Sequence, residues 1–105
     1  MIRVCKLDAQ GGVSFPEVAD TPEAMWEILG GYMEAIGLPP AFADQGLIGL
    51  VDEEGNLKKL PPNPFSWHLG HEALVGPILI VRTDPPEFVS LTDSDVVALS
   101  GHFAG

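Results

Sequence analysis

The first twenty residues have the hydrophobic pattern of two short strands. Strand-forming side chains occur in residues 1–8 and again in residues 12–19. Between them, Gln10-Gly11-Gly12 provides the paired glycines that permit a tight reversal. Pro16 lacks an amide hydrogen, so the second strand should lie at a sheet edge or contain a bulge. We therefore expect a strand pair at the start of the chain.

A helical pattern follows these strands. Asp20 or Thr21 can accept hydrogen bonds from free helix amides, and Pro22 suits a first turn. Glu23 adds a favourable charge and can form a capping box with Asp20. The next hydrophobic residues have the spacing of one buried helix face: Met25, Ile28, Leu29, Tyr32, Met33 and Ile36. This pattern predicts a helix that ends at Gly37.

Gly30 and Gly31 lie inside this expected helix, where each glycine costs about 1 kcal/mol relative to alanine. Such a pair is explained by close packing against a strand, by a local kink, or by a gap that faces a ligand. We favour close strand packing and keep Gly30 and Gly31 as candidate ligand-binding residues.

The middle of the chain predicts a hairpin and then a long surface loop. Residues 47–51 are a strand candidate, and Asp52-Glu53-Glu54-Gly55 is typical of a type I turn that ends with a left-handed glycine. The hairpin should return through residues 56–60. Three prolines then prevent ladder hydrogen bonds, so residues 61–76 should form a surface excursion with one helical turn near 67–73.

The last third of the chain predicts the centre of a sheet and a final helix. Residues 77–83 are almost wholly apolar, as expected for a strand that is buried on both faces. Residues 87–91 are a short strand candidate, and Thr92-Asp93-Ser94-Asp95 has the form of a capping box. The helix that it opens should end at Gly101.

These elements predict one α+β domain that spans residues 1–105. Their order is β-β-α-β-β-β-β-α. The sheet should be mainly antiparallel with about five to six strands, and the two helices should cover one face of it.

Several short segments, taken in order, resemble a known family. They are Gly30-Gly31-Tyr32-Met33-Glu34, Asp52-Glu53-Glu54-Gly55-Asn56-Leu57, Leu60-Pro61-Pro62-Asn63, Gly76-Pro77 and Ser90-Leu91-Thr92-Asp93. The family consists of small bacterial and phage proteins that share a domain of unknown function, and the resemblance spans about Met1 to Leu99. It implies a one-domain protein carried by bacteriophages or mobile elements, without known catalytic residues. The excursion at Phe65–Val75 is longer than in shorter members, so a function particular to this chain would reside there.

The charge of the chain argues against binding to nucleic acids or membranes. Fifteen acidic residues against five basic ones give a net charge of −10, which repels phosphate backbones and anionic lipids. The acids are spread along the chain, which favours a solubilising surface over mimicry of a phosphate backbone. The longest apolar run is shorter than the about 20 residues of a membrane span, and a single cysteine fits a reducing compartment. We expect a cytoplasmic protein of a bacterial or infected host cell.

Candidate reactive groups are few. His68, His71 and Glu72 could hold a divalent metal on one helical turn, but the remaining donors, His102 and Cys5, are remote in sequence. Incidental surface histidines are the simpler interpretation. Cys5 lies in a strand candidate without a helix N-terminus to lower its pKa, which favours a small core side chain over a nucleophile. We therefore expect no metal, no cofactor and no catalytic residue, which favours a protein that is not an enzyme.

The surface excursion at residues 61–76, which we call the proline-flanked loop, is the first choice for a partner-binding surface. Its aromatic residues can either fill the core or contact a partner. Phe65, Trp67, His68 and His71 are the candidate partner-binding residues.

Two functions remain open at this level. The favoured one is an accessory protein of phage or mobile-element origin that binds a host or phage macromolecule, most simply a protein. The alternative is a protein that binds or sequesters a small nucleotide-like ligand, with Gly30, Gly31 and Asn63 in its site. Unpaired strand edges also leave a homodimer open.

Overall fold

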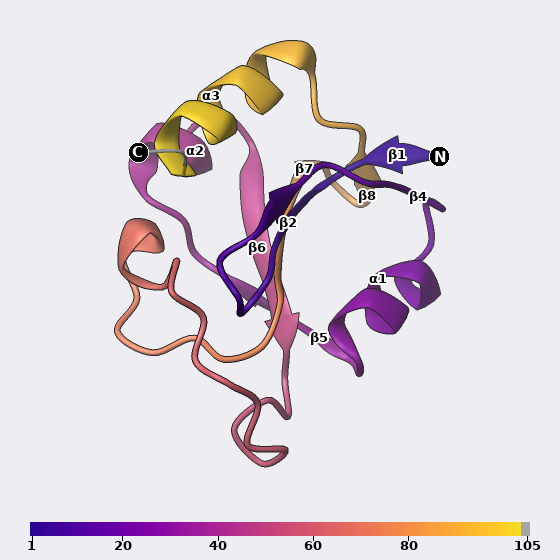
Figure 1. Cartoon of the computed structure of the whole chain (residues 1–105). Helices are drawn as coiled ribbons and strands as arrows, with labels where there is room; N and C mark the ends of the chain where they lie inside the picture. The colour runs from indigo at the N-terminus through magenta and orange to yellow at the C-terminus, as the bar shows by residue number, and fades with distance from the viewer. Residues whose placement is uncertain (104–105) are drawn as a thin grey trace.

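A mainly antiparallel sheet forms the centre of this computed structural model, which describes residues 1–103 (Figure 1). The strand order is β3-β2-β7-β6-β5, and β8 pairs with the end of β7. The strands of this sheet are β2 (Cys5–Leu7), β3 (Val13–Ser14), β5 (Met33–Ile36), β6 (Leu47–Asp52), β7 (Ile78–Asp84) and β8 (Glu87–Val89). The predicted α+β class with a mainly antiparallel sheet is confirmed.

The N-terminal strand pair forms two short ladders. β2 pairs with β3 in the main sheet, whereas β1 (Ile2–Arg3) pairs separately with β4 (Glu17–Val18). Between the ladders, the amide of Val4 donates to the carbonyl of Pro16 over 3.0 Å. Pro16 has no amide hydrogen to donate in return, so regular pairing is interrupted there. The strand pair was predicted, and Pro16 accounts for its division.

β7 is the central strand, as the sequence predicted. On one edge it pairs with β2 and β8, and on the other edge it pairs with β6. Ile78 and Ile80 belong to one hydrophobic cluster, and Leu79 and Val81 belong to another. All four side chains are fully buried, because successive strand residues point to opposite faces and both faces of this sheet are covered.

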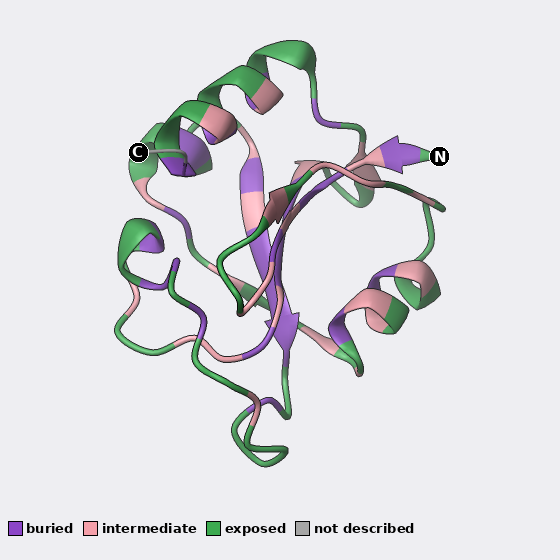
Figure 2. Cartoon of the chain, viewed as in Figure 1, coloured by how far each residue is buried: buried purple, intermediate pink, exposed green. Residues whose placement is uncertain are grey.

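The helices cover both faces of the sheet. Hydrophobic residues of α1 (Pro22–Leu29) pack in the cluster that contains Leu79. Residues of α3 (Asp93–Phe103) and of the short α2 (Pro40–Ala43) pack in the cluster that contains Ile80. Figure 1 shows α1 and α3 on opposite sides of the strands, and Figure 2 shows the exposed residues on the outer side of α3. The expectation that both helices share one face was wrong, since a sheet that is apolar on both faces needs a cover on each.

α1 is shorter than its hydrophobic pattern suggested. It begins after Thr21, whose Oγ1 accepts from the amide of Ala24 over 3.2 Å. It ends at Leu29, because Gly30 has a left-handed φ of 88° and its amide donates to the carbonyl of Trp26. Gly30 and Gly31 therefore follow the helix, and the expectation that they lie within it was wrong. The residues from Met33 to Ile36 instead form β5, and every residue of β5 pairs with a residue of β6.

The expected hairpin after β6 is also absent. β6 extends to Asp52 and pairs with β5 on one side and β7 on the other. With both sides occupied, it has no room for a returning strand from residues 56–60. That segment instead forms successive turns, in which the amide of Leu60 donates to the carbonyl of Gly55 over 3.1 Å and Lys59 has a φ of 55°.

The capping box that opens α3 is confirmed. Asp95 accepts from the amide of Thr92 over 2.8 Å, and Thr92 accepts from the amide of Asp95 over 3.1 Å. The helix continues through Gly101 to Phe103, so Gly101 is not its C-cap. Phe103 is buried, and its packing extends the helix beyond the glycine. No helix within residues 1–103 combines the length and apolar character that a membrane crossing requires.

Candidate functional site

Asn63 fastens the proline-flanked loop to the sheet. Its side-chain Nδ2 donates to the carbonyls of Leu7 and Gly76 over 3.0 and 2.9 Å, and its Oδ1 accepts from the amide of Phe65 over 2.9 Å. The residue is only 3% exposed. Both amide hydrogens are therefore used within the chain, which gives Asn63 a structural role in joining β2, the loop and the approach to β7.

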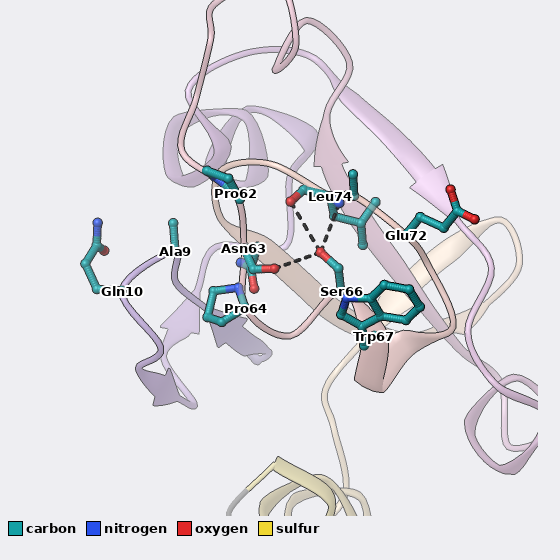
Figure 3. Close-up of a pocket in the computed structure, with 10 residues that line it drawn as sticks. Ala9, Gln10, Pro62, Asn63, Pro64, Ser66, Trp67, Glu72 and Leu74 are labelled. Carbon is teal, nitrogen blue, oxygen red and sulfur yellow. Dashed lines mark hydrogen bonds between the residues drawn. The ribbon is translucent and has the colours of Figure 1, made fainter.

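The Ser66 side chain links the two ends of the same loop by hydrogen bonds. Its hydroxyl donates to the carbonyl of Asn63 over 2.7 Å and accepts from the amide of Leu74 over 2.9 Å (Figure 3). The amide of Asn63 in turn donates to the carbonyl of Leu74 over 2.8 Å. The two limbs of the loop are thus held together by hydrogen bonds, and a rigid surface results.

Phe65 and Leu69 anchor the loop in the hydrophobic core. They are 6% and 1% exposed, and the Phe65 ring meets the Phe103 ring edge to face with centroids 5.3 Å apart. The helical turn that the sequence predicted is a short 3₁₀ helix, η1 (Trp67–Leu69), which ends at Gly70 in the left-handed conformation. Of the aromatic residues in this loop, Phe65 fills the core.

Trp67 has the opposite placement and is 75% exposed. It lines a surface hollow of about 550 Å³. The lining residues are Ala9, Gln10, Pro62, Asn63, Pro64, Ser66, Trp67, Glu72, Ala73 and Leu74. In Figure 3, Trp67 and Glu72 lie on one side of Pro64, and Ala9 and Gln10 lie on the other. We call this surface the Trp67 face.

The histidines of the loop have separate neighbours. The Nε2 of His71 lies 2.7 Å from the carbonyl oxygen of Gly37, whereas the Nε2 of His102 lies 2.9 Å from the carbonyl oxygen of His68. The rings of His68 and His102 are 6.1 Å apart between centroids. Within residues 1–103, no group of three His, Cys, Asp or Glu side chains is placed to hold a metal ion.

Gly30 and Gly31 lie beside a half-buried ion pair that sequence reasoning missed. The Nζ of Lys58 donates to Oδ2 of Asp52 over 2.7 Å and to the carbonyl of Gly30 over 2.8 Å. A methyl group added to Gly31 would lie 2.7 Å from that Nζ and 3.0 Å from Oδ1 of Asp52. Gly31 therefore leaves room for the side chain of Lys58. The available signal was an acid at the start of the predicted turn and a lysine six residues later, in the segment that was expected to return as a strand.

The Asp52 carboxylate is 1% exposed, and its charge is balanced within the turn. Burial by itself raises the pKa of Asp52, but hydrogen bonds from Lys58 and from the amide of Glu54, together with the charge of Lys58, outweigh it and leave the pKa lowered. Asp52 therefore stays ionised and holds the turn together.

Cys5 is a core side chain. It is fully buried in β2, and burial raises the pKa of its thiol to about 12. At neutral pH the thiol stays protonated, which makes it a poor nucleophile.

The fold and this surface define a small α+β domain that presents an exposed indole on a rigid loop. The chain belongs to the family described as Domain of unknown function (DUF3846), whose model matches residues 2–104. The resemblance to a domain of unknown function is thereby confirmed. No curated protein and no solved structure matches the chain.

Proposed function

We propose that this protein is a cytoplasmic accessory protein that acts by binding another protein, with the Trp67 face as the binding surface. The observation that carries the proposal is the 75% exposure of Trp67 on a loop in which Phe65 and Leu69 are buried. Tryptophan is enriched among the residues that contribute most to protein interfaces, because it combines a large apolar surface with a polar edge.

The rigidity of the loop supports this role. The side chains of Asn63 and Ser66 donate hydrogen bonds to backbone carbonyls, and Phe65 and Leu69 are buried in the core. The indole is thus displayed on a surface that is already ordered. A partner would bind without the entropy cost of ordering the loop, which favours affinity.

Small-ligand binding at Gly30 and Gly31 has less support from the geometry. The space next to Gly31 is occupied by Lys58 and Asp52 of the chain itself, and the amide hydrogens of Asn63 are both used. Native mass spectrometry tests this alternative directly. A retained mass that is lost on denaturation would favour the ligand, and the same spectrum reports the number of subunits.

Quantitative affinity capture from a host lysate tests the protein-binding proposal. The bait proteins are wild type, Trp67→Ala and Leu57→Ala, since Leu57 is 83% exposed and lies outside the Trp67 face. We expect the wild type and Leu57→Ala to retain the same partner and Trp67→Ala to lose most of it. Equal capture by all three baits would refute the proposal, provided that their melting temperatures agree.

A further inference from the structure

We infer that the Trp67 face binds a lysine or arginine side chain of an extended, proline-containing segment, with the cation placed between the Trp67 ring and the Glu72 carboxylate. This inference rests on the proposed protein-binding function and names the chemistry of the partner.

The geometry supplies the two groups that such a cation needs. Trp67 and Glu72 line the same hollow and lie on the same side of Pro64 (Figure 3). An indole face attracts a cation through its quadrupole, and a carboxylate pairs with the same charge. Both side chains are exposed, so an incoming side chain can reach them.

Two of the other polar side chains of the hollow, Asn63 and Ser66, are already engaged. The amide hydrogens of Asn63 go to the carbonyls of Leu7 and Gly76, and the Ser66 hydroxyl bonds to backbone groups of the loop. Among the described lining residues, Glu72 is the one charged side chain, and it forms no ion pair within residues 1–103. Selectivity for charge at this surface would therefore depend on Glu72.

The charge of the whole chain favours the same partner. A net charge of −10 attracts basic segments and speeds their encounter with the surface. An anionic segment would meet repulsion both from the chain and from Glu72. Charge complementarity thus selects a cationic occupant.

The apolar part of the hollow, formed by Trp67 and two prolines, suits a proline-containing segment. Pro62 and Pro64 are exposed beside Trp67 and form an apolar wall. Proline-containing segments in the polyproline conformation dock against aromatic surfaces of this kind at low entropy cost. A hollow of about 550 Å³ is within the range of specific binding sites.

Titration of ¹⁵N-labelled full-length protein with two defined peptides tests the inference. The probes are acetyl-Pro-Pro-Arg-Pro-Pro-amide and the matched peptide with Gln in place of Arg, and the Trp67 indole Nε1–H is the reporter. Trp67→Phe assigns that signal against the indole of Trp26. We expect the Arg peptide to shift the Trp67 signal and the Gln peptide to bind at least several-fold more weakly.

The variants Glu72→Gln and Glu27→Gln provide a pair with equal net charge. Glu27 is exposed on α1 and lies outside the hollow. We expect Glu72→Gln to weaken the Arg peptide on the order of fivefold, as for loss of an exposed ion pair, and Glu27→Gln to leave its affinity near wild type.

The outcomes separate this inference from the proposed function. Equal binding of both peptides, or no effect of Glu72→Gln, overturns the cation site but leaves an apolar protein-binding surface. No shift of the Trp67 signal by the Arg peptide at millimolar concentration also overturns it. The proposed function is tested separately by lysate capture, and it would fail if capture did not depend on Trp67.

Discussion

Asp95 at the start of α3 and Arg82 in β7 form a bidentate ion pair. The Nε and Nη2 of Arg82 donate to the two carboxylate oxygens of Asp95 over 2.7 and 2.6 Å. The remaining Nη1 of Arg82 donates to the carbonyl of Gln45 over 2.7 Å. One guanidinium group therefore joins the central strand to α3 and to the segment before β6.

Asp95→Asn should destabilise the protein strongly. The change removes the charge that balances Arg82, whose side chain is 24% exposed against 8% for Asp95. Removing one partner of a mostly buried pair leaves the other uncompensated, so we expect the free energy of unfolding to fall by about 3 kcal/mol. Urea denaturation measures the loss. Asp93→Asn is the matched control, because the Asp93 side chain is fully exposed and its replacement should leave stability near that of the wild type.

The stability of the protein should fall in acid through Asp95. The hydrogen bonds from Arg82 lower the pKa of Asp95 below its usual 3.8; burial opposes them, and the Thr92 contacts and the charge of Arg82 lower it further. A lowered folded-state pKa contributes stability that is present above the unfolded pKa and is lost as pH falls through the folded value. We expect the stability gap between the wild type and Asp95→Asn to be full at neutral pH and to narrow below about pH 4. Denaturation curves across this range test the sign, and a gap that widens in acid would contradict it.

Asn63→Ala should loosen the loop that carries Trp67. It removes two donated hydrogen bonds and leaves the carbonyls of Leu7 and Gly76 without that partner at a buried position. Each unsatisfied buried group costs about 1 to 3 kcal/mol, so we expect a loss of about 3 kcal/mol in total.

Hydrogen exchange at the amides of Phe65 and Leu74 measures the local effect of Asn63→Ala. Gln10→Ala is the control, since Gln10 lines the same hollow but is exposed. Unchanged protection of both amides in Asn63→Ala would show that the loop is held by its core anchors alone.

Gly31→Ala should act through Lys58. The added methyl group would meet the Lys58 ammonium and the Asp52 carboxylate, so the side chain of Lys58 must move away. Asp52 is buried, but Lys58 is 37% exposed, so we expect a modest loss of about 1 to 2 kcal/mol in the free energy of unfolding. A double-mutant cycle with Lys58→Ala measures the coupling, and purely additive losses would show that the two residues act independently.

Local signals in the sequence determined several elements of this protein. The reciprocal pair Thr92 and Asp95 caps α3, and Thr21 caps α1, because capping depends on side chains within a few residues of the helix start. The apolar run of β7 identified the central strand, since a strand buried on both faces cannot alternate with polar residues. The family resemblance and the α+β class were also evident from the sequence.

Long-range pairing decided what the sequence left open. The apolar residues of 32–36 fit one face of a helix, but pairing with β6 makes residues 33–36 a strand, and α1 ends at Leu29. The same pairing, with β7 on the other side, prevents the hairpin that the acidic turn suggested. Each of these outcomes depends on backbone partners that are distant in sequence.

The candidate site was also predicted in part from the sequence and decided in part by the tertiary structure. The sequence identified the proline-flanked loop and its aromatic residues, whereas the tertiary structure placed Phe65 in the core and Trp67 at the surface. Composition cannot distinguish these two residues, because both are large and apolar. Their placement depends on the core space next to Phe103, and on the Asn63 hydrogen bonds that orient the loop against the sheet.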